Sequence, residues 1–291
     1  MNQETKQLLP AVKNWSLRTR ELEFGSLPKL MGILNVTPDS FSDGGVFYST
    51  QSAIDRALEL EDDGADILDI GGESTRPYAE LVAADDELKR IVPVLEGLAG
   101  RLSIPISIDT SKANVAEAAI GLGAEIINDI SGLELDPRMV AIASRSQVGV
   151  CAMHMQGTPQ TMQDHPRYEN VVQEILDYLA MRDQFLIANK INPSKICLDP
   201  GIGFGKTHEH NLELLGSVSN FHALQRPILV GHSRKGFIAR VIQDKQADRI
   251  PGSIGVSLAM AAKRIQILRI HDVLATRQAL LLFEAAGGLV N

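Results

Sequence analysis

The chain has 291 residues, of which 44% are hydrophobic and 22% charged, and its net charge is -8. This composition excludes a largely disordered chain, and the acidic balance argues against a nucleic-acid-binding protein or one held on an anionic membrane. The length suits one α/β barrel of about 250 residues with a short extension.

Residues 1–29 are predicted to form an N-terminal extension packed on the main domain. The segment MNQETKQLLPAVKNW lacks a long apolar stretch and a cleavage signature, so we expect no signal peptide. No apolar run approaches the roughly 18 residues of a membrane span. Cys151 and Cys197 each lie in an apolar run, which is typical of small core residues. These features together indicate a cytoplasmic protein.

From residue 30 onward, short apolar runs rich in β-branched residues alternate with segments of helical spacing. The predicted strands are 30–36, 65–70, 104–109, 125–129, 148–153, 196–199, 228–231 and 267–271. The segments of helical spacing include 52–63, 86–98, 113–122 and 168–189, and 254–264 and 272–286 complete the alternation. Eight such units favour a single closed (β/α)8 barrel, of the TIM type, over residues 30–291. An open doubly wound sheet is the alternative, since it shows the same alternation.

Polar side chains follow almost every predicted strand, where the carboxyl ends of a barrel form the active face. A single Asp at such a position is more often a helix N-cap or a turn former than a functional group. Eight strands that end in this way are hard to explain by capping alone. The residues are Asn35, Asp69, Asp109, Asn128, Asp129, His154, Asp199, Ser233, Arg269 and His271.

Two loops have the composition of segments that close over a substrate. The loop after the first strand, TPDSFSDGG, is polar and glycine-rich, and its aromatic residue Phe41 needs a partner. The second loop, GGESTRP, has paired glycines that let backbone amides approach a ligand, and Thr75 and Arg76 can donate to an anion. An ordinary surface loop and a buried Glu73 ion pair are the alternatives.

Three later motifs also suit an anionic ligand. In DPGIGFGK, alternating glycines could form an anion nest, although the spacing fits neither a dinucleotide fingerprint nor a P-loop. GHSRKG follows the seventh strand, where barrels commonly hold phosphate, and Arg234 and Lys235 in it could equally be surface charges. Arg269 and His271 lie two residues apart and so share one side of the last strand.

The candidate site therefore has two halves. The first suits a flat heterocycle rich in N–H groups and contains Asp109, Asn128 and Asp199. The second suits a pyrophosphate and offers cationic donors from Arg76, Lys235, Arg269 and His271. No Ser–His–Asp, Cys–His or zinc-cluster spacing is evident.

The motifs ILNVTPDSFSDGG, DIGGESTRP, SIDT, IND, MHMQGTP, DPGIGFGKT, SRKGF and LRIHDV occur in this order between residues 31 and 273. In this ordered set the chain resembles the dihydropteroate synthase family of pterin-binding barrels. The resemblance implies a transferase that joins 6-hydroxymethyl-7,8-dihydropterin pyrophosphate to p-aminobenzoate in folate biosynthesis. It also implies Mg²⁺, a homodimer and a target of sulfonamides.

Carried over by motif, the family's site residues fall into three groups. The resemblance implies pterin contacts from Asp109, Asn128, Met153, Asp199 and Lys235. It implies pyrophosphate contacts from Asn35, Arg269 and His271, with Asn35 also at the metal. It implies p-aminobenzoate contacts from Phe41, Thr75, Arg76, Pro77, Phe204 and Ser233. The catalytic set would be Asn35, Asp109, Lys235, Arg269 and His271, acting through stabilisation of the leaving pyrophosphate in a dissociative displacement.

The chain departs from the family pattern at two places. Many members have Gly where this chain has Tyr78, and we expect this residue to stiffen the second loop. Many also have Gly-Ala where this chain has Arg264 and Ile265, and we expect only a packing difference there.

Two rival functions remain. A methyltetrahydrofolate-dependent methyltransferase would share the Asp and Asn contacts to pterin. It would need neither the two anion motifs nor the FSDGG loop. A non-catalytic pterin-binding protein is disfavoured, because no key polar position carries an apolar residue.

Overall fold

The computed structural model describes residues 12–37 and 45–289, without the side chains of residues 45–49. Its centre is a barrel of parallel strands in the order β8-β7-β6-β5-β4-β3-β10-β9. The strands are β3 (Lys29–Asn35), β4 (Ile67–Gly71), β5 (Ile106–Asp109), β6 (Ile126–Asp129), β7 (Gly149–Met153), β8 (Ile196–Asp199), β9 (Leu229–Val230) and β10 (Ile267–Ile270). A parallel bridge between Leu198 and Ile228 joins the two ends of this order. The closed-barrel prediction is confirmed, and the open sheet is wrong.

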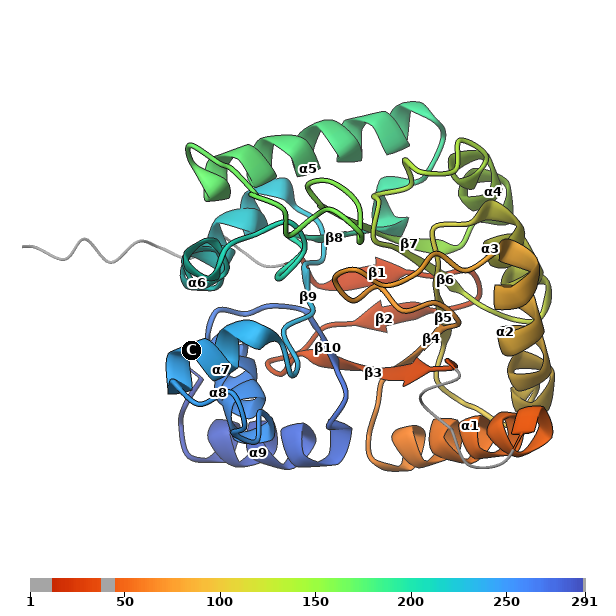
Figure 1. Cartoon of the computed structure of the whole chain (residues 1–291), viewed down its shortest axis with the longest axis horizontal. Coiled ribbons are helices and arrows are strands. Elements are labelled where there is room, and N and C mark those ends of the chain that lie inside the picture. The colour runs from red at the N-terminus through yellow and green to blue at the C-terminus, as the bar shows by residue number, and fades with distance from the viewer. Residues whose placement is uncertain (1–11, 38–44, 290–291) are drawn as a thin grey trace, which may run out of the picture.

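Helices surround the strands as an outer layer (Figure 1). They are α1 (Gly45–Asp62), α2 (Ala84–Leu98), α3 (Ala113–Gly121), α4 (Met139–Ser146), α5 (Val171–Ala188), α6 (His208–Ser217), α7 (Gly236–Ile242), α8 (Ile250–Ala262) and α9 (Val273–Ala285). Short 3₁₀ helices, η2 (Pro193–Lys195) and η3 (Val218–Leu224), precede β8 and β9. Among the described helices, none has the length and apolar character needed to cross a bilayer.

An antiparallel hairpin closes the amino end of the barrel. Its strands are β1 (Asn14–Ser16) and β2 (Glu21–Glu23). Trp15 is fully buried, and its indole Nε1 donates to the carbonyl oxygen of Lys195 at 2.9 Å. Leu17 packs over Gly149, where an added Cβ would lie 2.6 Å from the leucine methyl. The hairpin therefore serves as an apolar plug for the barrel.

The barrel interior changes from apolar to polar between its two ends. The apolar layer beside the hairpin contains Met31, Ile67, Ile126, Cys151, Cys197, Leu229 and Ile267. Because side chains alternate along a strand, the residues two positions further on face the same interior at the carboxyl end. Those residues include Asp69, Asn128, Met153, Asp199 and Arg269. The strand pattern thus brings the polar groups to one end of a single barrel.

Candidate active site

The carboxyl end of the barrel holds a charged network drawn from four strands. Arg269 of β10 donates from Nε to Asp69 Oδ2 of β4 at 2.6 Å, and from Nη2 to Asp109 Oδ2 of β5 at 2.6 Å. Asn128 of β6 donates from Nδ2 to the same Asp69 oxygen at 3.2 Å. Asp69, Asp109 and Asn128 are all buried. The two predicted halves of the site therefore meet at Arg269, which contacts a residue assigned to the pterin.

Burial governs the ionisation of this network. Loss of hydration raises the pKa of Asp109 to about 7, and the neighbouring charge of Arg269 opposes part of the rise. Burial opposes ionisation of Arg269 as well, yet the carboxylates of Asp69 and Asp109 raise its pKa above the usual value. The site thus combines a permanent cation with a carboxyl group that titrates near neutrality.

Asp199 lies at the end of β8 and supports the glycine-rich turn that follows it. Its Oδ1 accepts from Gly201 N at 2.7 Å, and burial raises its pKa. Gly201 has φ +70, and a Cβ there would lie 1.9 Å from the carbonyl oxygen of His154, so only glycine fits. Gly203 N donates to Asn211 Oδ1 at 2.6 Å. Since these amides are already bonded within the protein, the anion nest expected from the glycines is not supported.

Lys235, Phe204 and Met153 lie around Asp199. The Lys235 Nζ is 4.6 Å from the centre of the Phe204 ring and donates to the carbonyl oxygen of Ile202. Burial lowers the pKa of Lys235 to about 8. Met153 is buried and pairs in register with Asp199. These contacts bring three residues assigned to the pterin beside one assigned to p-aminobenzoate.

Ser233 and His271 form a pair between the ends of β9 and β10. The His271 Nδ1 lies 3.0 Å from Ser233 Oγ, and the His271 backbone N–H donates to the same oxygen at 3.2 Å. Burial lowers the pKa of His271 to about 4, and Arg269 lowers it further. The ring is therefore neutral at pH 7, which corrects the expectation that His271 is a cationic donor. Arg234, by contrast, is an exposed residue paired with Asp272.

The second loop, residues 72–83, has a fixed base. Lys112 Nζ contacts Glu73 Oε2 at 2.7 Å and Glu87 Oε2 at 2.6 Å. The other Glu73 oxygen accepts from Val82 N at 2.7 Å, so the two ends of the loop are tied together. The ion pair that was the alternative reading of Glu73 is therefore present.

The tip of the second loop carries the residues expected to contact p-aminobenzoate. Thr75 is half-buried, while Arg76 and Pro77 are exposed at the rim. Tyr78 has φ +62, and its hydroxyl donates to Asp164 Oδ1 at 3.1 Å. Its backbone N–H donates to the Pro159 carbonyl oxygen at 3.0 Å. The tip is thus latched to the loop after β7.

Asn35 and Phe41 come from the first strand and its loop. Asn35 ends β3, is half-buried, and makes no side-chain hydrogen bond with the described residues. Phe41 lies outside the described residues. Asn35 therefore lies at the carboxyl end of β3, which is the end of the barrel that holds the charged network.

Lys206 and His154 connect two loops at the carboxyl end of the barrel, and neither was assigned a role from the sequence. Lys206 is 2% exposed, and its Nζ donates to the Phe204 carbonyl oxygen at 2.8 Å and lies 3.1 Å from His154 Nδ1. Burial lowers the pKa of both groups, that of His154 to about 3. The pair cross-links the loops after β7 and β8. No signal in the sequence indicates that Lys206 is buried, because a lysine in a glycine-rich turn is usually exposed.

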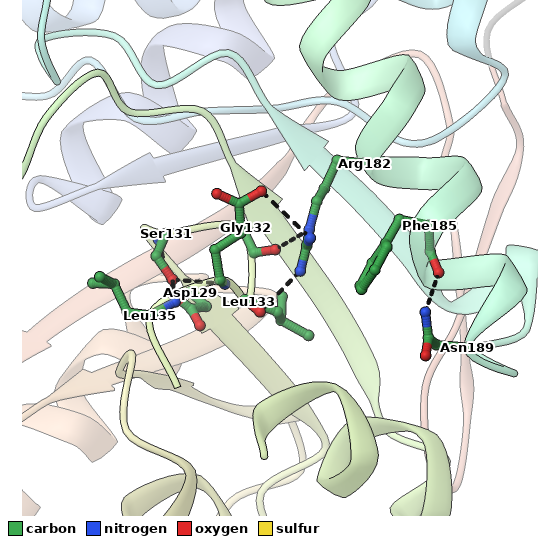
Figure 2. Close-up of polar contacts among 9 residues, drawn as sticks. Asp129, Ser131, Gly132, Leu133, Leu135, Arg182, Phe185 and Asn189 are labelled. Carbon is green, nitrogen blue, oxygen red and sulfur yellow. Dashed lines mark hydrogen bonds and ion pairs between the residues drawn. The ribbon is translucent and has the colours of Figure 1, made fainter. Parts of the chain in front are cut away.

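A second support holds the loop after β6. Figure 2 shows Arg182 of α5 directed at this loop, where Nη2 donates to the Leu133 carbonyl oxygen at 2.8 Å and Nε to that of Gly132. Asp129 Oδ1 accepts from Ser131 N at 2.8 Å. Asp129 is therefore a turn former, which is the usual role of an Asp at the end of a strand. Its neighbour Asn128, in contrast, belongs to the charged network.

The described residues contain no group of three or more His, Cys, Asp or Glu side chains arranged to hold a metal ion. Mg²⁺ usually keeps several waters and binds through one or two protein oxygens together with substrate phosphates. The amide oxygen of Asn35, which has no described partner, fits that mode of binding. A metal cage built from protein side chains does not fit the described part of the chain.

Comparison with known proteins gives one consistent result. Residues 31–271 match the family model described as pterin binding enzyme. A dihydropteroate synthase from Haemophilus influenzae is 44% identical over 260 residues, covering 89% of this chain and 94% of that protein. The structure of the Yersinia pestis dihydropteroate synthase with a sulfonamide drug complex is 40% identical, with a TM-score of 0.87, and covers 94% of this chain and 99% of that one. The Xanthomonas albilineans dihydropteroate synthase with 4-aminobenzoic acid is 37% identical, with a TM-score of 0.88, and covers 96% and 100%.

Proposed function

This chain belongs to the pterin-binding enzyme family, as a transferase of its dihydropteroate synthase group in folate biosynthesis, and on that premise we propose its reaction. The enzyme joins 6-hydroxymethyl-7,8-dihydropterin pyrophosphate to p-aminobenzoate. The C–O bond to pyrophosphate breaks, a C–N bond forms, and the amine proton passes to solvent. The products are 7,8-dihydropteroate and pyrophosphate.

The observation that carries this proposal is the charged layer at the barrel mouth. Asp109, Asn128 and Asp199 offer acceptors and an amide, which suit the N–H edge of a pterin. Arg269 adds a permanent cation within the same layer, at 2.6 Å from Asp109. A substrate with a flat heterocycle at one end and a pyrophosphate at the other has the complementary charge distribution.

The p-aminobenzoate is proposed to bind between the rim of the second loop and the turn after β9, which is the seventh strand of the barrel in chain order. Thr75, Arg76 and Pro77 lie on that loop, and Arg76 can pair with the carboxylate. Phe204 and Ser233 would face it from the other side. The bound ligand named for the Xanthomonas albilineans relative, 4-aminobenzoic acid, supports p-aminobenzoate as a ligand of this chain, without bearing on where it binds.

Catalysis is proposed to come from stabilisation of the leaving group. An aromatic amine is neutral at pH 7, so it needs no strong base to expose its lone pair. Pyrophosphate gains negative charge as it departs, and Arg269 stands ready to stabilise that charge. His271 would donate a hydrogen bond as a neutral ring. Asn35 would hold Mg²⁺, which supplies further electrostatic stabilisation of the leaving group when bound.

The order of bond changes follows from the same charges. The electron-rich dihydropterin can share positive charge on its methylene carbon, and the nearby carboxylates of Asp109 and Asp199 favour such a cation. We therefore propose a dissociative displacement, in which the C–O bond breaks ahead of attack by the amine.

One experiment tests both the reaction and the order of steps. Purified protein with Mg²⁺ should release pyrophosphate only when both substrates are present, which neither rival function predicts. In single turnover, ring-substituted p-aminobenzoates should react at rates that depend little on the basicity of the amine. Absence of product with folded protein would reject the reaction. A steep dependence on basicity would reject the dissociative order alone.

We also propose a cytoplasmic homodimer. Cys151 and Cys197 are buried and free, as suits a reducing compartment, and recovery of the protein from a secreted fraction would contradict this.

Large apolar side chains are exposed on α7 and α9, where Val241 is 57%, Leu281 51% and Leu282 71% accessible. Such a surface suits contact with a second copy. Sedimentation at micromolar concentration should give twice the chain mass, and a stable monomer would contradict the proposal.

A further inference from the structure

Asp69 is a fully buried carboxylate that the predicted site does not use. It lies within β4, so it caps no helix, since α2 begins at Ala84. Its Oδ2 accepts from Arg269 Nε at 2.6 Å and from Asn128 Nδ2 at 3.2 Å. Its Oδ1 is buried and has no hydrogen-bond partner among the described residues.

A carboxylate in such a place is costly and needs a reason. Removal of a charge from water is unfavourable unless the charge is paired and hydrogen-bonded. Arg269 is the described ion-pair partner of Asp69. An apolar residue at this position would extend the barrel core, as Ile67 does two positions earlier. The arrangement therefore stabilises one placement of Arg269 at the expense of a simpler core.

The contact with Asp69 fixes how the guanidinium is turned. Nε and Nη2 lie on one edge of this planar group, and that edge faces Asp69 and Asp109. Nη1 makes no hydrogen bond or ion pair with the described residues. The Arg269 side chain as a whole is 20% exposed. Asp69 and Asp109 thus hold one edge of the cation and leave the other for an anion.

Resting on the proposed function, we propose that Asp69 is a positioning residue that anchors Arg269 through Nε and so directs Nη1 to the departing pyrophosphate. Asp109 alone would not suffice, because it also receives the pterin. When Asp109 turns to the ligand, Asp69 remains as the anchor of Arg269. Asp69 also accepts from the side-chain amide of Asn128, so the same carboxylate orients this amide, which is assigned to the pterin.

The variant Asp69→Asn tests the anchor through kcat, the KM for p-aminobenzoate and the affinity for pyrophosphate. Loss of the charged contact should lower kcat about tenfold to a hundredfold, the scale of a small misplacement of a catalytic group. The KM for p-aminobenzoate should change less than about threefold, since Asp69 does not contact that half. Inorganic pyrophosphate, titrated into enzyme saturated with 6-hydroxymethylpterin, should bind about tenfold more weakly.

The matched control is Asp129→Asn. Asp129 is equally buried, ends the strand beside β5, and also has one oxygen without a described partner. It contacts Ser131, not Arg269. This variant should leave kcat and pyrophosphate affinity within about twofold of wild type, even where it lowers the melting temperature.

A second variant covers the case in which Asp69→Asn does not fold. Arg269→Lys keeps the positive charge but cannot contact Asp69 and still present a second, fixed nitrogen, so it should show a similar fall in kcat and in pyrophosphate affinity. Wild-type values for a folded Asp69→Asn, or for Arg269→Lys, would overturn the inference. Wild-type protein that makes no product would instead reject the proposed function, while the pyrophosphate titration still decides the role of Asp69.

Discussion

At the scale of single residues, the carboxyl group of Asp109 has an unusual position in the pH range. Burial raises its pKa to about 7, so it is protonated in roughly half of the free molecules near neutral pH. A pterin N–H edge is recognised by the carboxylate form. We therefore expect affinity for 6-hydroxymethylpterin to rise as pH increases through 7, by at most about tenfold per pH unit.

The same proton acts on folding in the opposite direction. A carboxyl group whose pKa is raised in the folded state stabilises the fold at low pH, and that contribution is lost as pH rises through 7.

Calorimetric titration between pH 5.5 and 8.5 measures the affinity for 6-hydroxymethylpterin. Asp109→Asn is the control, and it should lose the part of the pH dependence that comes from this carboxyl group. Equal profiles for the two proteins would show that Asp109 does not titrate in this range.

Elements hold the site through contacts that span different loops, and Tyr78 provides an example. Both departures from the family pattern, Tyr78 and Arg264, have positive φ, at +62 and +57. Glycine adopts that region without strain, which explains why many members carry it there. In this chain the tyrosine hydroxyl contacts Asp164, so the second loop gains a latch at the cost of backbone strain.

Loss of the latch should loosen the loop. Tyr78→Phe keeps the ring and removes the hydrogen bond to Asp164. Hydrogen exchange at the backbone amide of residue 78, which donates to Pro159, should accelerate about twofold to tenfold. Asp164→Ala should reproduce the effect, while Tyr168→Phe, in the same loop as Asp164, should not. Unchanged exchange in both latch variants would mean that the backbone bonds alone hold the tip.

At this scale the sequence also shows what it can predict. Each predicted strand overlaps the observed one because a buried β-branched run followed by a polar turn is a strong signal. Helices α4, α6 and α7 were not predicted, and each of them has ten residues or fewer. The hairpin strands have three residues each, too few for an alternating pattern to be visible.

The site was predicted in its members but not in its connections. Asp109, Asn128 and Asp199 are brought together as expected, because strand ends converge in any closed barrel. The partnership of Arg269 with Asp69 depends on side chains 200 positions apart. The neutrality of His271 depends on burial by neighbouring strands. Neither property is encoded in a local pattern, so both required the closed structure.

For the whole molecule, the hairpin plug should matter for stability and not for chemistry. Trp15 is fully buried at the amino end, whereas the charged network lies at the carboxyl end. Trp15→Ala removes a large core side chain and should lower the free energy of unfolding by about 3–5 kcal/mol. Urea denaturation followed by circular dichroism measures this loss.

The activity of the same variant separates the two ends of the barrel. The folded fraction should retain kcat within about twofold, because no described residue of the hairpin contacts the network. Trp15→Phe is the graded control and should lose less stability, since it keeps an aromatic ring but not the bond to Lys195. A loss of less than about 1 kcal/mol in Trp15→Ala would show that the plug adds little.

The plug has one more consequence, which concerns spectroscopy. Trp15 is the single tryptophan of the chain, and its indole is sealed from solvent at the end of the barrel remote from the ligands. Its fluorescence emission should therefore shift to longer wavelength when the barrel opens and remain nearly constant when substrates bind. The protein thus carries an intrinsic optical reporter of barrel integrity that is insulated from the events at its own active site.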